Sequence, residues 1–173
     1  FFTPSDSVQD VTLFAKYTLR ADEMFLNRMI GGTFEGSNDP DFREKEVLYL
    51  INEKPKRLQT VVQSYSSKSY RYVRYIGPKY SHCNIAEAAF YTPNDTASLK
   101  GKVIGTPGCF QKDGSHEYTN VFDGDVTTSF DYVEPSGGWS GLDLGIPKQI
   151  GRIIYTPRNY DNYVCHGDDY ELF

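Results

Sequence analysis

Apolar and polar residues alternate in many short segments of the chain, a pattern typical of β-strands with one buried face. The clearest alternation is at 69–78, where Tyr70, Tyr72 and Arg74 are expected on one face and Val73 on the other. Further strands or apolar segments are predicted at 11–19, 33–35, 46–51, 58–65, 84–91, 102–106, 140–145, 148–158 and 167–173. Short strands joined by turn-rich loops indicate an all-β sandwich.

Composition supports this fold class. Aromatic residues make up 15% of the chain, and Tyr and Phe favour the half-buried surface of a sheet. The 15 Gly and 9 Pro residues supply many turns, so the only helical candidate is a short helix or a loop at 20–29. With 39% hydrophobic residues, a chain of 173 residues is long enough for one ordinary folded domain or two very small ones.

The charge of the chain argues against nucleic-acid binding. Its 18 basic and 23 acidic residues give a net charge of −5, whereas a duplex-binding domain carries a basic surface. No apolar run reaches the roughly 20 residues that a membrane-spanning helix needs. The chain begins with Phe1 and has neither an initiator Met nor a signal-peptide core, so we expect it to be part of a longer protein.

The reactive side chains do not indicate catalysis. Cys83, Cys109 and Cys165 form no CxxC motif, and both one disulfide with a free thiol and three reduced thiols are compatible with their spacing. There is no GxSxG or HExxH motif, and no two carboxylates are paired as a glycosidase requires. We therefore expect a non-catalytic protein.

Three motifs in the second half of the chain resemble a known family. They are FDGDVTTSF at 122–130, GGWSGLDLG at 137–145, and IGRIIYTPRN at 150–159 followed by YELF. In this order they resemble the opening half of a discoidin, or coagulation-factor type C, domain, which is also similar to family 32 carbohydrate-binding modules. The resemblance implies a galactose-binding-like jelly-roll sandwich.

The first half of the chain resembles the closing half of the same domain. The segments are FEGSND at 34–39, YRYVRYIGP at 70–78 and NIAEAAFY at 84–91. The halves therefore stand in reversed order. One interpretation is a single, circularly permuted sandwich over 1–173; the other is two partial domains, 1–92 and 93–173, from a tandem array.

The resemblance implies a structural calcium site in the segment 122–128. There Asp123, Asp125 and Thr128 supply hard oxygen atoms of the kind that Ca²⁺ prefers, and the family completes the site with a glutamate that corresponds to Glu87. An ionised Glu87 that faces inward needs a cation or a hydrogen-bond donor. The alternative is an Asx-type turn in which the aspartates cap backbone amides. If the two halves belonged to different domains, Glu87 and Asp125 would not meet.

Loops at one end of the sandwich are expected to bind sugar. Sugars are held by aromatic faces and by planar polar groups that hydrogen-bond to hydroxyls. The candidate residues are Arg158, Asn159, Tyr160, Asn162, Tyr163, His116 and Tyr132. The alternative is that they are ordinary turn residues. Trp139, just before the Leu-Asp-Leu-Gly strand, is expected in the core.

These features predict a carbohydrate-binding module of a larger secreted or cell-surface glycan-active protein. Its expected partners are a glycan and the other domains of the parent protein. The rival class is a protein- or surface-adhesion module of the discoidin type, and a fragment of a glycoside hydrolase is the least favoured. A shallow polar site gains little after desolvation, so we expect dissociation constants on the order of 0.1–1 mM.

Overall fold

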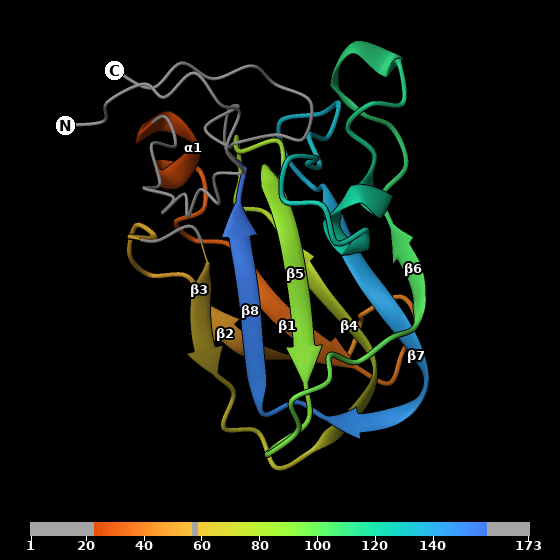
Figure 1. Ribbon diagram of the computed structural model, residues 1–173. Helices are drawn as coiled ribbons and strands as arrows, with labels where there is room; N and C mark the ends of the chain where they lie inside the picture. The colour runs from red at the N-terminus through yellow and green to blue at the C-terminus, as the bar shows by residue number, and fades with distance from the viewer. Residues whose placement is uncertain (1–22, 57–58, 159–173) are drawn as a thin grey trace, which may run out of the picture.

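The computed structural model describes residues 23–56 and 59–158, which form a β-sandwich with almost no helix (Figure 1). The strands are β1 (Thr33–Ser37), β2 (Lys45–Leu50), β3 (Thr60–Gln63), β4 (Ser69–Ile76), β5 (Ile85–Tyr91), β6 (Lys102–Gly105), β7 (Trp139–Gln149) and β8 (Arg152–Pro157). The helical elements are α1 (Glu23–Asn27) and two 3₁₀ segments, η1 (Phe110–Lys112) and η2 (Tyr118–Phe122). The all-β class predicted from the alternation is confirmed. The strands predicted at 11–19 and 167–173 lie outside the described residues.

The strands form two antiparallel sheets. The larger sheet has the order β2-β1-β4-β7-β6, and the smaller has the order β3-β8-β5. In each sheet a strand from the second half of the chain pairs with strands from the first half. β7 pairs with β4, and β8 lies between β3 and β5 (Figure 1). Strands from both sides of the 92–98 connector therefore build both sheets.

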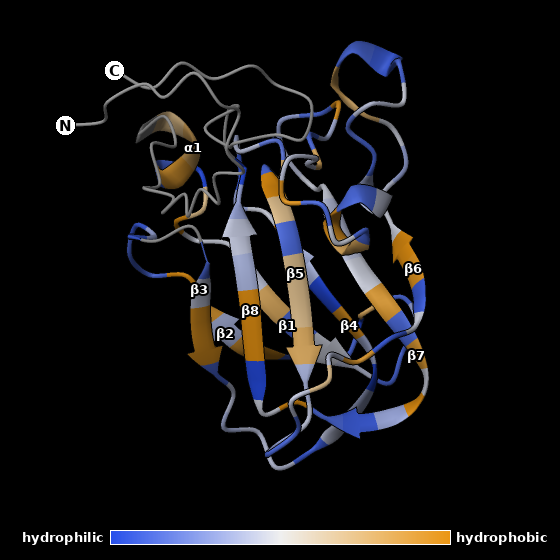
Figure 2. Cartoon of the chain, in the orientation of Figure 1, coloured by the Kyte–Doolittle hydropathy of each residue, from blue (hydrophilic) through white to orange (hydrophobic). Residues whose placement is uncertain are grey.

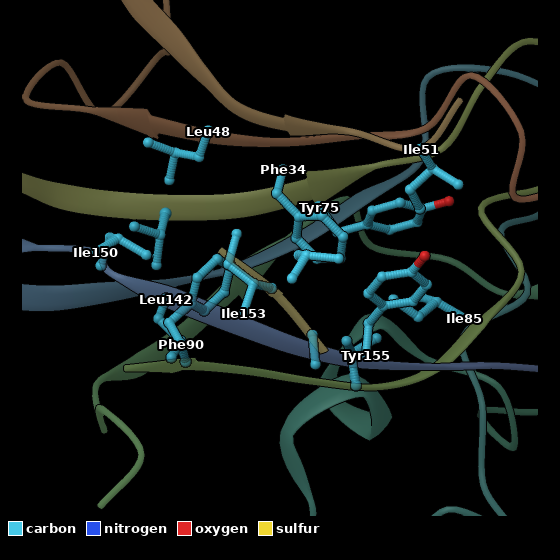
Figure 3. Close-up of a cluster of buried hydrophobic side chains, with 14 of the residues drawn as sticks. Phe34, Leu48, Ile51, Tyr75, Ile85, Phe90, Leu142, Ile150, Ile153 and Tyr155 are labelled. Atoms are coloured by element: carbon cyan, nitrogen blue, oxygen red, sulfur yellow. The ribbon is translucent and has the colours of Figure 1, made fainter. Parts of the chain in front are cut away.

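Aromatic and branched aliphatic side chains fill the space between the two sheets. The ring of Phe34 lies 5.1 Å from that of Tyr75, 5.3 Å from that of Tyr155 and 6.0 Å from that of Phe90, measured between centroids. Figure 3 shows these side chains pointing toward one another, and Figure 2 shows apolar stretches within β3, β5 and β8. Such large buried rings supply much of the hydrophobic stabilisation of a small sandwich.

A register shift in β4 decides which side chains of this strand enter the core. The shift lies between Tyr70 and Tyr72, opposite β7. As a result Tyr70, Val73 and Tyr75 are all buried in the core, and Arg74 is on the outer face. The uniform alternation predicted for this strand placed Tyr70 and Arg74 on the same face. That prediction is wrong because the regular pairing of β4 with β7 is broken here: Tyr70 pairs with Lys148 and Tyr72 with Asp143, so β7 contains the extra residues.

Arg74 organises the outer face of the larger sheet. Its Nε and Nη2 atoms lie 2.8 and 2.7 Å from Glu35 Oε2, and its guanidinium carbon lies 4.0 Å from the ring centre of Phe42 and 5.2 Å from that of Trp139. Trp139 pairs with Ile76, which is on the same face as Arg74. The core position predicted for Trp139 is therefore wrong. Its ring instead covers a buried ion pair.

The strand predicted at 148–158 is divided into the end of β7 and the whole of β8. The break lies at Ile150 and Gly151, where the chain reverses and passes beside Pro93. A Cβ atom on Gly151 would lie 2.8 Å from Pro93 Cα, so this close approach favours glycine. The apolar pattern alone does not show the reversal because β7 and β8, which belong to different sheets, both contribute buried residues.

Cys83 and Cys109 are buried free thiols. Burial raises the pKa of the Cys83 thiol to about 12, so this side chain behaves as a small core residue. Cys165 lies outside the described residues. Within the described part of the chain, no helix has the length and apolar character needed to cross a membrane.

Candidate functional site

Segments from both halves of the chain meet at the upper end of the sandwich in Figure 1. This end carries α1, the β4–β5 loop (77–84), the long β6–β7 connection (106–138) and the last residues of β8. Loops held by rigid strands are where binding groups are commonly placed. Side chains from these segments, or from the residues directly after α1 and β8, are linked by hydrogen bonds around the carboxylate of Asp131.

Four of these side chains form a continuous hydrogen-bonded chain, which we call the Asp131 cluster. Arg28 Nη1 donates to Asn84 Oδ1 at 2.7 Å, and Asn84 Nδ2 donates to Asp131 Oδ1 at 2.7 Å. Arg158 Nη1 donates to the other carboxylate oxygen, Asp131 Oδ2. The guanidinium carbons of Arg28 and Arg158 also lie 5.7 and 4.8 Å from the ring centre of Phe25. Because Asp131 and Arg158 are almost fully buried, each requires the pairing that the other provides.

The backbone around Asp131 is fixed by three neighbouring segments. Its N–H donates to His116 O at 3.1 Å, and its C=O accepts from Phe110 N–H at 2.7 Å. The next residue, Tyr132, donates its N–H to His82 O at 2.7 Å. These bonds hold the carboxylate in one place without help from a ligand.

A cavity of about 180 Å³ lies against the Asp131 cluster. Its lining residues are Met24, Phe25, Arg28, His82, Phe110, Asp131 and Arg158. His82 Nδ1 lies 2.9 Å from Tyr132 O, and because a carbonyl oxygen only accepts, Nδ1 must donate. The other ring nitrogen, Nε2, is then the acceptor in the neutral imidazole. The cavity thus combines donors, an acceptor and an apolar wall.

The loop that carries His82 is strained. Tyr80, His82 and Cys83 have φ values of 65°, 55° and 54°, in the left-handed region that side chains disfavour. Gly138 packs so tightly against this loop that a Cβ atom there would lie 2.9 Å from Cys83 Cβ. Strained residues persist where the surrounding structure determines their conformation, and they are often found at functional sites.

The structure brings one predicted sugar-binding side chain, that of Arg158, into the cluster. His116 and Tyr132 support Asp131 through their backbones, but neither side chain lines the cavity. His116 Nδ1 lies 3.3 Å from Ser129 O, and the ring of Tyr132 packs 6.0 Å from that of Phe130. The remaining predicted residues lie outside the described part of the chain; they are Asn159, Tyr160, Asn162 and Tyr163.

Sequence reasoning missed most of the cavity. Asp131 directly follows the segment FDGDVTTSF, and Asn84 begins the strand predicted at 84–91. A polar residue at the end of a motif or strand was therefore the feature of the sequence that could have indicated these two residues. Arg28 and Phe110 carry no such signal. Their position depends on how α1 and the β6–β7 connection fold back over the end of the sandwich.

The four predicted calcium ligands meet at a second place, beside η2. Gly124 N–H donates to Glu87 Oε1 at 2.8 Å, so the strand of the first half lies against the loop of the second. Thr128 Oγ1 lies 2.8 Å from Asp123 Oδ2 and 3.0 Å from Asp125 O. We call Glu87, Asp123, Asp125 and Thr128 the acidic loop site.

The Glu87 carboxyl lies in surroundings that disfavour its charge. Burial and, next, a hydrogen bond with the Asp123 carboxyl raise the pKa of Glu87 to about 8. A proton on Glu87 that is hydrogen-bonded to Asp123, or a cation between the two carboxyl groups, would compensate for these surroundings.

The acidic loop site fits a calcium ion only in part. Carboxylates, a hydroxyl and a backbone carbonyl are the donors that Ca²⁺ prefers, and Glu87 and Asp123 face each other. Asp125 instead accepts from the Thr127 hydroxyl at 2.6 Å and from the Thr127 N–H at 2.9 Å. Over residues 23–56 and 59–158, no three His, Cys, Asp or Glu side chains are arranged to hold a metal ion. The hydrogen bonds of Asp125 match the Asx-type turn.

Comparisons with known proteins give no match: none of the protein family profiles, curated protein sequences or solved structures corresponds to this chain. The structure therefore defines the class by itself, as a β-sandwich with a charged cavity at one end.

Proposed function

We propose that the protein is a non-catalytic carbohydrate-binding module whose sugar site is the cavity beside the Asp131 cluster. The observation that carries this proposal is the composition of the cavity wall. Phe110 is 50% exposed and supplies an apolar face, while two guanidinium groups beside it are held in place by hydrogen bonds. Sugars require this combination because one side of the ring is apolar and its edge carries hydroxyls.

The resemblance to discoidin domains supports the same function. We propose that the sandwich is a galactose-binding-like jelly roll, circularly permuted so that the closing half of the family's domain precedes the opening half. The pairing of β7 with β4 and of β8 with β5 supports this proposal, because each pair joins one strand from either half. The parent protein would then be a secreted or cell-surface protein in which further modules compensate for weak binding at one site.

We also propose a structural Ca²⁺ at the acidic loop site. Glu87 and Asp123 would hold the ion through their carboxylates, with the Asp125 carbonyl and the Thr128 hydroxyl as further donors. The ion would replace the shared proton between the two carboxyl groups and would fasten the loop to β5. Its role would be to stabilise the fold, not to take part in a reaction.

Binding of the intact chain to a glycan array, followed by calorimetric titration of the sugars it selects, tests the sugar site. We expect Phe110→Ala to weaken binding by about tenfold or more, because it removes the exposed ring of the cavity wall. The matched control is Tyr65→Ala. Tyr65 is 93% exposed and follows β3, whose end at Gln63 pairs with Arg152 at the opposite end of β8.

Two results would contradict the proposal. One is an array without any bound glycan although the protein is folded, which together with capture of a protein partner would favour the adhesion module. The other is equal weakening by Phe110→Ala and Tyr65→Ala, because a site at the Asp131 cluster cannot depend on Tyr65.

A further inference from the structure

Among the described residues that line the cavity beside the Asp131 cluster, basic side chains outnumber acidic ones. Asp131 is the single carboxylate among these described lining residues, and both of its oxygens are already engaged, Oδ1 by the Asn84 amide and Oδ2 by Arg158. Arg28 donates to the neutral amide oxygen of Asn84 and faces the ring of Phe25. In the described part of the chain Arg28 therefore has no carboxylate partner.

Three other arginines among the described residues are neutralised by carboxylates. Arg43 pairs with Asp39, Arg71 pairs with Asp143 and Arg74 pairs with Glu35. Arg152 also lacks a carboxylate partner among the described residues, since its Nη2 donates to Asp95 O and its guanidinium lies over the ring of Tyr91. Arg28 differs because it lines a cavity and is held by the side-chain amide of Asn84. Because a guanidinium in a partly desolvated site attracts an anion, the charge of Arg28 points to a negatively charged ligand.

The remaining walls limit what this anion can be. The planar fork of a guanidinium matches a carboxylate in a bidentate arrangement. Phe110, which is 50% exposed, provides an apolar surface in the same cavity as Arg28. The volume of about 180 Å³ is below the roughly 300–1,000 Å³ of sites for larger ligands. A ligand that consists of a single ring with an apolar side and a carboxylate satisfies these conditions.

We infer that the cavity binds a terminal acidic sugar, of the uronic or sialic acid type, whose carboxylate pairs with Arg28. The inference rests on the proposed carbohydrate-binding function and names its substrate class. Arg158 contributes by holding Asp131, and His82 Nε2 is available to accept from a sugar hydroxyl.

Calorimetric titration of the intact chain with two carboxylated sugars, galacturonic acid and N-acetylneuraminic acid, and with galactose and a sulfated galactose tests this inference. We expect at least one of the two acids to bind about tenfold or more tightly than galactose, and its affinity to fall as the salt concentration rises. Arg28→Gln should abolish the preference while leaving the thermal unfolding midpoint close to that of the wild type, and Arg28→Lys should retain part of it. Arg43→Gln, a change in an exposed loop arginine, is the control that should have no effect.

The outcomes separate this inference from the function on which it rests. Equal binding of galactose and the acids, unaffected by Arg28→Gln, would overturn the acidic ligand and leave a neutral sugar site. Preference for a sulfated galactose over both carboxylated sugars would overturn the carboxylate. Failure to bind any sugar would overturn both the inference and the proposed function.

Discussion

At the scale of single residues, the Glu87 carboxyl links the stability of the fold to pH. Its pKa is about 8 in the folded protein and about 4.5 in an unfolded chain. Between these values the folded state keeps a proton that the unfolded state loses, so stability is greatest below about pH 4.5 and falls as the pH rises through 8. Because the carboxyl is only partly buried, solvent screening limits the loss to about 2 kcal/mol.

Denaturation in urea at about pH 5 and about pH 9, with a chelator present, measures this effect. We expect the free energy of unfolding of the wild type to fall between these pH values, and Glu87→Gln to reduce the fall. Glu134→Gln, at an exposed position, is the matched control. An identical pH dependence for the wild type and Glu87→Gln would contradict the shared proton.

Calcium bound at the Glu87 carboxyl should raise the stability of the fold, whereas loss of its proton lowers it. If the ion binds between Glu87 and Asp123, added Ca²⁺ should raise the melting temperature near pH 8, because a ligand bound only by the folded state stabilises it. Glu87→Gln should remove this rise without unfolding the protein. A wild-type melting temperature that does not respond to Ca²⁺ would leave the Asx-type turn as the account of this loop.

At the scale of the elements, the contact of β7 with β4 depends on the absence of a side chain at Gly141. A Cβ atom there would lie 2.2 Å from Val73 O and 2.7 Å from Arg74 Cβ. We expect Gly141→Ala to lower the free energy of unfolding by about 2–4 kcal/mol, because the two central strands of the larger sheet must separate slightly. Ile146→Ala, at an exposed position of the same strand, should change it by less than about 0.5 kcal/mol.

Urea denaturation of the two variants provides the comparison. A Gly141→Ala protein as stable as Ile146→Ala would show that β4 and β7 are not packed as closely as the structure places them.

Alternation of apolar residues predicted most of these elements but not their irregularities. The strand expected at 84–91 is found as β5, and the strand expected at 102–106 is found as β6, because each is a short run between clear turn signals. The register shift between β4 and β7 and the reversal at Gly151 were not predicted. Both arise from contacts with a neighbouring segment, so neither has a local pattern of its own.

The candidate site, like the strands, was predicted in part from the sequence. The meeting of Glu87 with the loop at 122–128 followed from the family resemblance, and Arg158 was expected in a binding role. The part played by Asp131 was missed, because the other members of its cluster, Arg28, Asn84 and Arg158, come from three other segments. Contacts between segments that are far apart in the sequence form only in the folded sheets, so no residue spacing predicts them.

At the scale of the whole molecule, the sharing of both sheets by the two halves of the chain implies one cooperative unit. Trp139 lies at the start of β7, next to β4, and so reports on contact between the halves. We expect its fluorescence and the far-ultraviolet circular dichroism to change at the same denaturant concentration, as in two-state unfolding. Two separate transitions would contradict a shared core and favour two partial domains.

The central claim is that the cavity beside the Asp131 cluster binds sugar, and an NMR titration of the ¹⁵N-labelled chain tests it most directly. With a sugar selected on the array, we expect the backbone amide signals of Asn84, Phe110 and Asp131 to shift progressively, and those of Tyr65 and Ile146 at the other end of the sandwich to stay unchanged. Signals that shift only at the far end, or nowhere at all, would contradict the claim.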